Sequence, residues 1–131
     1  MAANTIPIFP LTPRITATAI STAVTTRTLT GVGSAVLAYT AGSNGTRVDS
    51  ITICATATTT VGVIRFWYYI GSGNALLWQE VLVTALTPST TVAVFMYEFN
   101  PSNWILPTGS TLYVSPHNAE AFNIIVRGGD Y

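Results

Sequence analysis

The side chains that could do chemistry are few, and they stand apart in the sequence. His117 is the only histidine and Cys54 the only cysteine, so no nucleophile–histidine–acid triad and no cysteine–histidine metal set stands out. Glu80 and Glu98 are the carboxylate pair that could suggest glycoside hydrolysis. However, Glu80 has a predicted arginine partner and Glu98 comes at the end of a strand. We therefore expect no enzyme, no metal and no cofactor, with His117 in a turn and Cys54 a buried thiol on a strand.

Binding to nucleic acid or membranes is also not expected. Five arginines and no lysine balance five acidic residues, so the net charge is zero and the phosphate-neutralising contribution to nucleic-acid binding is missing. The glycines fall in turns with no following helix that could cradle a phosphate. No window is apolar enough to span a membrane, and the start of the chain lacks the positive region of a signal peptide. We expect the protein to be made in a reducing cytoplasm.

The surface of the chain must be nearly free of charge. Charged residues make up 8% of the sequence, against about 25% in an ordinary globular domain. Solubility of a free monomer usually depends on a higher and unbalanced charge. This composition indicates a protein that spends its life packed against copies of itself or against a larger assembly.

The elements that must position these residues are strands. The 131 residues suit one domain, and the composition, rich in Thr, Val, Ile and aromatic residues, favours strands over helices. Turn signals separate about eight strand candidates, which predicts an all-β antiparallel sandwich or barrel over residues 14–131. The candidates are Arg14–Ile20, Ala35–Thr40, Val48–Ala57, Val61–Ile70, Ala75–Thr84, Thr90–Phe99, Thr111–Ser115 and Phe122–Arg127. Residues 21–30 could hold a further strand or a loop, and residues 127–130 are expected to form a flexible exit.

Residues 1–13 are predicted to form an extended N-terminal arm. Pro7, Pro10 and Pro13 exclude a helix and interrupt regular strand pairing. The apolar residues between them favour contact with a neighbouring surface over free solvation. The residues expected to make that contact are Ile6, Ile8, Phe9 and Leu11.

The hairpin over residues 61–84 carries the strongest interface signal. A loop centred on residues 72 and 73 sets Tyr69 opposite Leu76, Trp67 opposite Trp78, Arg65 opposite Glu80 and Val63 opposite Leu82. The other face of this hairpin is predicted to be core, with Ile64, Phe66, Tyr68, Ile70, Leu77 and Val81. The two tryptophans beside the ion pair are therefore expected to face a partner. The alternative is that a loop or the N-terminal arm of the same chain covers them.

Several segments resemble a group of small virion structural proteins of tailed bacteriophages, some of which are head decoration (cement) proteins. The resemblance rests on the run 41–48 leading into the strand at 51–53, and on residues 77–80, 106–109 and 118–123. It covers the chain from about residue 14 to its end. The resemblance implies a jelly-roll or similar β-sandwich that binds the outside of the capsid, bridges major capsid proteins and forms homo-oligomers. Among these we favour a trimer over a dimer. It implies no catalytic residue.

On this reading the partners are the major capsid protein and further copies of the chain, and the location is the capsid surface. The arm and three tryptophans, Trp67, Trp78 and Trp104, are the expected anchors, with the Arg65–Glu80 pair beside them. Two alternatives stay open. Exposed aromatic side chains could stack on sugars in a carbohydrate- or receptor-binding module, or the same sandwich could serve as a tail or neck adaptor.

Overall fold

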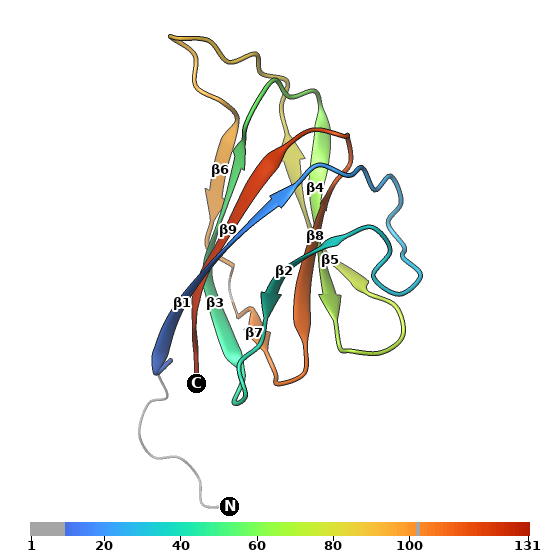
Figure 1. The fold of residues 1–131 in the computed structure, drawn as a ribbon, viewed down its shortest axis with the longest axis vertical. Coiled ribbons are helices and arrows are strands. Elements are labelled where there is room, and N and C mark those ends of the chain that lie inside the picture. The colour runs from blue at the N-terminus through green and yellow to red at the C-terminus, as the bar shows by residue number, and fades with distance from the viewer. Residues whose placement is uncertain (1–9, 102) are drawn as a thin grey trace, which may run out of the picture.

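A computed structural model describes residues 10–101 and 103–131. Within that part the chain is all-β, with two antiparallel sheets facing each other (Figure 1). Residues 10–101 and 103–131 contain no helix, and so none that could cross a membrane. The strands are β1 (Thr12–Ile20), β2 (Val36–Thr40), β3 (Thr46–Ala55), β4 (Gly62–Tyr69), β5 (Leu76–Val83), β6 (Met96–Phe99), β7 (Ile105–Leu106), β8 (Thr111–Pro116) and β9 (Phe122–Asp130).

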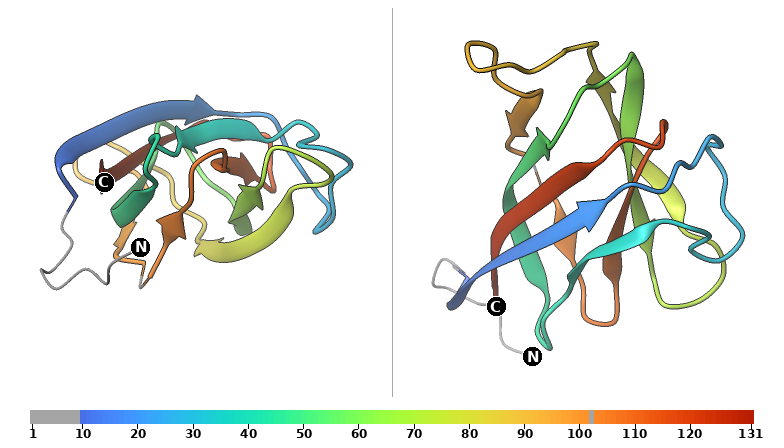
Figure 2. Two further views of the ribbon diagram at one scale, coloured as in Figure 1. Left: turned by 90° about the horizontal axis from the view of Figure 1, so that it is seen from below. Right: turned by 45° about the horizontal axis from the view of Figure 1, so that its top comes forward.

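The chain crosses repeatedly between the two sheets, and only the pairs β4–β5 and β6–β7 are consecutive strands of the same sheet. Sheet A has the order β1-β9-β3-β6, with the short β7 paired to the start of β3, and sheet B has the order β2-β8-β4-β5. The view from below in Figure 2 shows the two layers, with β1 and β2 near each other. At this edge the Thr16 hydroxyl donates a hydrogen bond of 2.8 Å to the Ala38 carbonyl oxygen, which links the two sheets. The opposite edge lies between β5 and the β6–β7 side.

The core fills the space between the sheets with one side of each strand. Alternate residues of a strand point to opposite faces, so Ile51 and Ile53 of β3 face Ile64 and Phe66 of β4 across one continuous cluster. Strands β8 and β9 add buried residues with the same period, namely Leu112, Val114, Phe122, Ile124 and Val126. Of the side chains predicted to form the core face of the 61–84 hairpin, Ile64, Phe66 and Val81 are buried as expected, whereas Ile70 is exposed and that part of the prediction is wrong.

A polar seam joins the two sheets at the end of β9. The Asp130 carboxylate accepts hydrogen bonds from Thr46 Oγ1 at 2.5 Å, Arg14 Nη1 at 2.9 Å and Tyr39 Oη at 3.1 Å. Arg14 also donates to the Thr40 carbonyl oxygen across the sheets at 3.0 Å. Desolvation raises the pKa of Asp130, but these hydrogen bonds and the Arg14 charge outweigh it, so the pKa is lowered overall.

Each predicted strand range overlaps an observed strand, with differences at the ends. Strand β1 begins at Thr12, so the last two residues of the predicted arm belong to the sandwich. Strand β6 holds four of the ten residues predicted for it. The expected flexible exit at 127–130 is wrong, because these residues continue β9 as far as Asp130 in register with both β1 and β3. The two-residue β7 was not predicted, and Ile6, Ile8 and Phe9 of the arm lie outside the described residues.

Candidate interaction surface

The β4–β5 hairpin carries a bulge that divides the predicted register into a correct and an incorrect half. Arg65 pairs with Glu80, and Val63 with Leu82, as predicted. Between Phe66 and Trp67 the register shifts by one residue, so Trp67 pairs with Leu77. Such a bulge re-aims the side chains that follow it. Leu77 therefore joins Trp67 on the outer side, and the predicted Trp67–Trp78 and Tyr69–Leu76 pairs are wrong.

The outer face of sheet B is covered by the chain's own residues 21–35, which we call the strap. Trp67, predicted to face a partner, is 0% exposed. Its indole Nε1 donates to Ser115 Oγ at 2.9 Å. The side chains that bury it include Val24 within the strap, with further strap residues Leu29, Val32 and Ala35 packed around the cluster. The alternative that a loop of the same chain covers this face is the arrangement observed.

The Arg65–Glu80 pair holds the strap in place. Arg65 is almost fully buried, and its Nε donates to Glu80 Oε1 at 2.8 Å. Its Nη1 donates to the carbonyl oxygen of Val24 in the strap at 2.6 Å. Arg27, also in the strap, donates to the same Glu80 oxygen at 2.8 Å. Desolvation raises the pKa of Glu80, but the hydrogen bonds from Arg27 and Arg65 outweigh it, so the pKa is lowered.

His117 completes this cluster, although the sequence placed it only in a turn. Its Nδ1 lies 3.2 Å from Arg65 Nη2. Its backbone N–H donates to the Val63 carbonyl oxygen at 2.9 Å. The buried Arg65 guanidinium is therefore contacted by Glu80, His117 and the strap, so neither Arg65 nor Trp67 is available as a surface anchor for a partner.

Trp78 and Trp104 stack on each other between the two sheets. Their ring centroids are 4.4 Å apart and their planes 18° from parallel. Trp104 is buried and also meets Phe66 and Phe99 edge-on. The expectation that Trp104 is an exposed anchor is wrong, because the ring fills the core beside Phe66. Trp78 is half-buried, and the bulge turns it toward the core.

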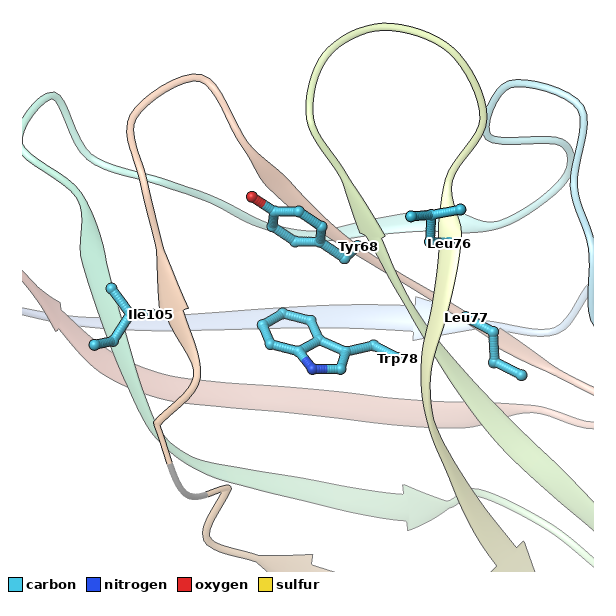
Figure 3. A pocket seen from close by; sticks show the side chains of 5 residues that line it. All are labelled: Tyr68, Leu76, Leu77, Trp78 and Ile105. Carbon is cyan, nitrogen blue, oxygen red and sulfur yellow. The ribbon is translucent and has the colours of Figure 1, made fainter.

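An apolar hollow opens beside Trp78 at the edge between β5 and β7 (Figure 3). Its volume is about 280 Å³, and no charged side chain lines it. Leu76 and Ile105, on opposite sides of the opening in Figure 3, are 64% and 52% exposed. We call this hollow the edge groove. It is lined by Tyr68, Leu76, Leu77, Trp78 and Ile105.

A second hollow of about 380 Å³ follows farther along β5. It lies between residues 79–84 and the β6 side, where Phe95, Tyr97 and Phe99 line it. Glu80 is the charged residue in its lining. The edge between β5 and β6–β7 is therefore apolar over much of its length. Tyr68, Leu76 and Ile105 were not named as interface candidates. Tyr68 was assigned to the core face of the hairpin, and Ile105 lies in a strand that was not predicted.

The outer face of sheet A is uncovered by any described segment and is built from small or uncharged residues. We call it the bare face. Ala17 of β1 pairs with Ile125 of β9, which pairs with Thr52 of β3. Ile15 and Met96 extend this face and are exposed. Its charged side chains are Arg47, Asp49, Glu98 and Arg127; Arg47 donates to Asp49 Oδ1 at 2.8 Å, and Arg127 donates to Thr52 Oγ1 at 2.9 Å.

Two residues with reactive or titratable side chains, Cys54 and Glu98, also lie on sheet A. Their positions do not suit them to act together in catalysis or metal binding. Cys54 sits half-buried on the outer side of β3, opposite Asn123 and Met96, and not in the core. Glu98 is exposed on β6, whereas Glu80 lies on sheet B and is bound by two arginines. Among the described residues, no three His, Cys, Asp or Glu side chains gather as metal ligands would.

Comparisons with family models, curated proteins and solved structures find no match to this chain.

Proposed function

We propose that this chain is a structural protein of a tailed-phage virion that binds the outside of the capsid. In this role it bridges major capsid proteins and stabilises the shell as a decoration, or cement, protein. The observation that carries the proposal is the bare face: a whole sheet face made largely of Ala, Thr and aliphatic side chains, whose four charged residues, Arg47, Asp49, Glu98 and Arg127, sum to no net charge. Such a face is poorly solvated in a free monomer and suits contact with a larger body.

The strand order supports a jelly roll as the finer fold. Eight strands form two four-stranded sheets, β1-β9-β3-β6 and β2-β8-β4-β5, and β7 is a two-residue addition to sheet A. Interleaving of early and late strands in both sheets is what two nested Greek keys produce. Viral capsid domains and lectins both use this architecture.

The mechanism is mass action and involves no catalysed step. A subunit that binds the assembled shell and not its dissociated parts stabilises the shell by its binding free energy at each occupied site. A contact surface with no net charge makes this binding only weakly dependent on salt. The chain is made in the host cytoplasm and reaches the capsid surface after the shell has formed.

The test uses particles of the virus that encodes the chain. Protein mass spectrometry of purified heads and tails should find the chain in the head fraction. Shells reconstituted with it should release their DNA at a higher temperature than bare shells. Absence from purified particles would overturn the proposal, and recovery in the tail or neck fraction would transfer the chain to an adaptor role.

A matched pair of variants locates the contact. Ala17→Arg places a charge on the bare face, whereas Ala85→Arg places the same charge on an exposed loop position after β5. Binding of Ala17→Arg to shells should fall by about tenfold or more, and Ala85→Arg should bind like the wild type. Equal binding by both variants would exclude the bare face as the capsid contact.

One observation favours carbohydrate binding as a second candidate. Tyr68 and Trp78 present aromatic rings at the edge groove, and aromatic rings can stack on sugars. A glycan array decides between the two functions. Binding that Tyr68→Ala abolishes would establish a receptor-binding module, and a blank array would leave the capsid proposal as it stands.

A further inference from the structure

We propose that the edge groove binds the N-terminal residues 4–9 of a second copy of this chain. This inference deepens the proposed function, on which it rests, by naming the surface through which copies of the chain associate. It joins an apolar groove at one edge of the sandwich to an apolar segment that leaves the opposite edge.

The groove has the size and chemistry to take apolar side chains. Its volume is about 280 Å³ and its lining consists of Leu, Ile and aromatic residues without a charge. A cavity of about 150 Å³ with such a lining already holds one benzene molecule. The groove therefore has room for one or two side chains of the size of Ile or Phe.

The strands beside the groove have open edges. Among the described strands, β5 pairs only with β4, and β7 only with β3. Backbone groups on the free side of an edge strand can pair with an extended peptide, while alternate side chains of that peptide enter pockets. An extended segment is thus the kind of ligand that this edge can hold.

Residues 4–9 match this description in their sequence. The run Asn4-Thr5-Ile6-Pro7-Ile8-Phe9 carries no charged side chain. Ile6 and Ile8 are two residues apart, so in an extended segment both point to the same side. Pro7 fixes an extended backbone and limits pairing to one or two hydrogen bonds at its flanks. Affinity would then come mainly from Ile6, Ile8 and Phe9.

The positions of the two regions favour exchange between copies. The described chain starts on the β1–β9 side of sheet A, where Leu11 N donates to the Asp130 carbonyl oxygen at 2.8 Å. The groove lies at the other end of the sheet order, beside β7. A contact from one edge of a copy to the opposite edge of the next is heterologous, and it closes into a ring when the rotation permits. A trimer is such a ring.

Cysteine cross-linking between distinguishable chains tests this inference. In a Cys54→Ser background, an affinity-tagged Ile8→Cys chain is mixed with an untagged Ile105→Cys chain and oxidised. A disulfide forms only where the two Cβ atoms come within about 4.5 Å, so we expect a mixed dimer on a non-reducing gel. The control pairs Ile8→Cys with Ile70→Cys, because Ile70 is 62% exposed yet lies outside the groove lining.

Nine residues can span about 30 Å, so the segment could also reach the groove of its own chain. The double variant Ile8→Cys/Ile105→Cys separates the two cases. An intrachain disulfide in that variant, with no mixed dimer from the single variants, would overturn exchange between copies. A mixed dimer no stronger than the Ile70 control would overturn the groove as the binding site.

A charge-insertion series provides a second readout. Ile105→Glu and Ile8→Glu should each weaken self-association by about tenfold or more, measured by light scattering over a range of concentrations. Ile70→Glu should leave self-association unchanged. Unchanged self-association in Ile105→Glu and Ile8→Glu would contradict the inference.

Shell binding, measured on the same variants, keeps the two proposals apart. If the cysteine variants bind shells as the wild type does but form no mixed dimer, the inference is wrong and the proposed function stands. Cross-links in a chain that is absent from purified particles would remove the proposed function and leave the self-association surface.

Discussion

The outer faces of the two sheets are built from the same strand-forming residue types, but one is covered by its own chain and the other is bare. On sheet B the outward residues include the large rings of Trp67, Tyr69 and Tyr113, and the strap lies over them. On sheet A the corresponding positions hold side chains without an aromatic ring, such as Ala17, Ile125 and Thr52. A large apolar ring left in water costs much more free energy than a methyl group. The size of the outward side chains therefore decides which face the chain must cover itself.

The two faces also differ in how charge is used. The covered face holds the buried Arg65 guanidinium, which binds Glu80, His117 and the strap carbonyl of Val24. The bare face holds Arg127 and Glu98 at its surface. Charge on sheet B fixes a loop inside the monomer, whereas sheet A keeps a nearly neutral surface free for contact.

The largest effect is expected from truncating the ring at the centre of the covered face. Trp67→Ala should destabilise the fold by about 3–5 kcal/mol, because it opens a cavity under the strap and leaves Ser115 Oγ without its indole donor. Urea unfolding measures this, and Trp67→Phe should cost less. On the bare face Ile125→Ala should lower the free energy of unfolding by clearly less than Trp67→Ala does. Equal losses would contradict the claim that only the outer face of sheet B needs cover from its own chain.

Removing the carboxylate that binds the strap should have an intermediate effect. Glu80→Gln takes the charged acceptor from Arg65 and Arg27, and hydrogen bonds to charged groups are worth about 1.5–3 kcal/mol. Hydrogen exchange in residues 24–30 should accelerate more than exchange in β3 or β9. Glu98→Gln on the bare face is the matched control and should change neither quantity. Hydrogen exchange in the strap of Glu80→Gln that is as slow as in the wild type would show that the Arg65–Glu80 pair does not hold the strap in place.

A pH-dependent loss of stability should come from the seam, which belongs to neither outer face. The pKa of Asp130 is lower in the folded chain than its ordinary value. Its stabilising contribution is therefore present above the unfolded-state pKa and is lost as the pH falls through the folded-state pKa. Asp130→Asn should make the acid limb of a stability-against-pH curve shallower, as measured by urea unfolding at several pH values. A curve identical to the wild type would remove Asp130 from the acid response.

The smallest effect on stability is expected at the bare face. Ala17→Arg should change the free energy of unfolding by no more than about 0.5 kcal/mol, as for most exposed positions. The same variant is the one expected to lose shell binding, so stability and binding should separate there. A large loss of stability in Ala17→Arg would mean that this face has a structural role within the monomer.

Local pattern was sufficient to predict most of the strands and part of the hairpin. The Arg65–Glu80 pair was predicted by counting outward from the turn at residues 72 and 73, and it is observed. The same count gives the wrong partners closer to the turn. The bulge after Phe66 shifts the register by one residue, so Trp67 pairs with Leu77. The bulge brings Trp78 against Trp104, which lies far along the chain. That packing demand is not visible in the sequence of the hairpin.

The strap and the edge groove were beyond sequence reasoning for related reasons. Residues 21–35 have no strand or helix period, and only scattered apolar residues such as Val24 and Leu29 hint that they cover something. The groove combines β4, β5 and β7, and β7 is a two-residue strand without a recognisable pattern. Both features depend on which strands become neighbours in space.

Pro13 has a consequence for how copies of this chain can grow into larger objects. It lies within β1, a strand with a neighbour on one side only, and it has no backbone N–H to offer. A sheet edge interrupted in this way is a poor template for another strand, and natural proteins use this device against fibril formation. Endless strand-by-strand growth through sheet A is thereby blocked at one margin, which favours finite, closed assemblies over filaments.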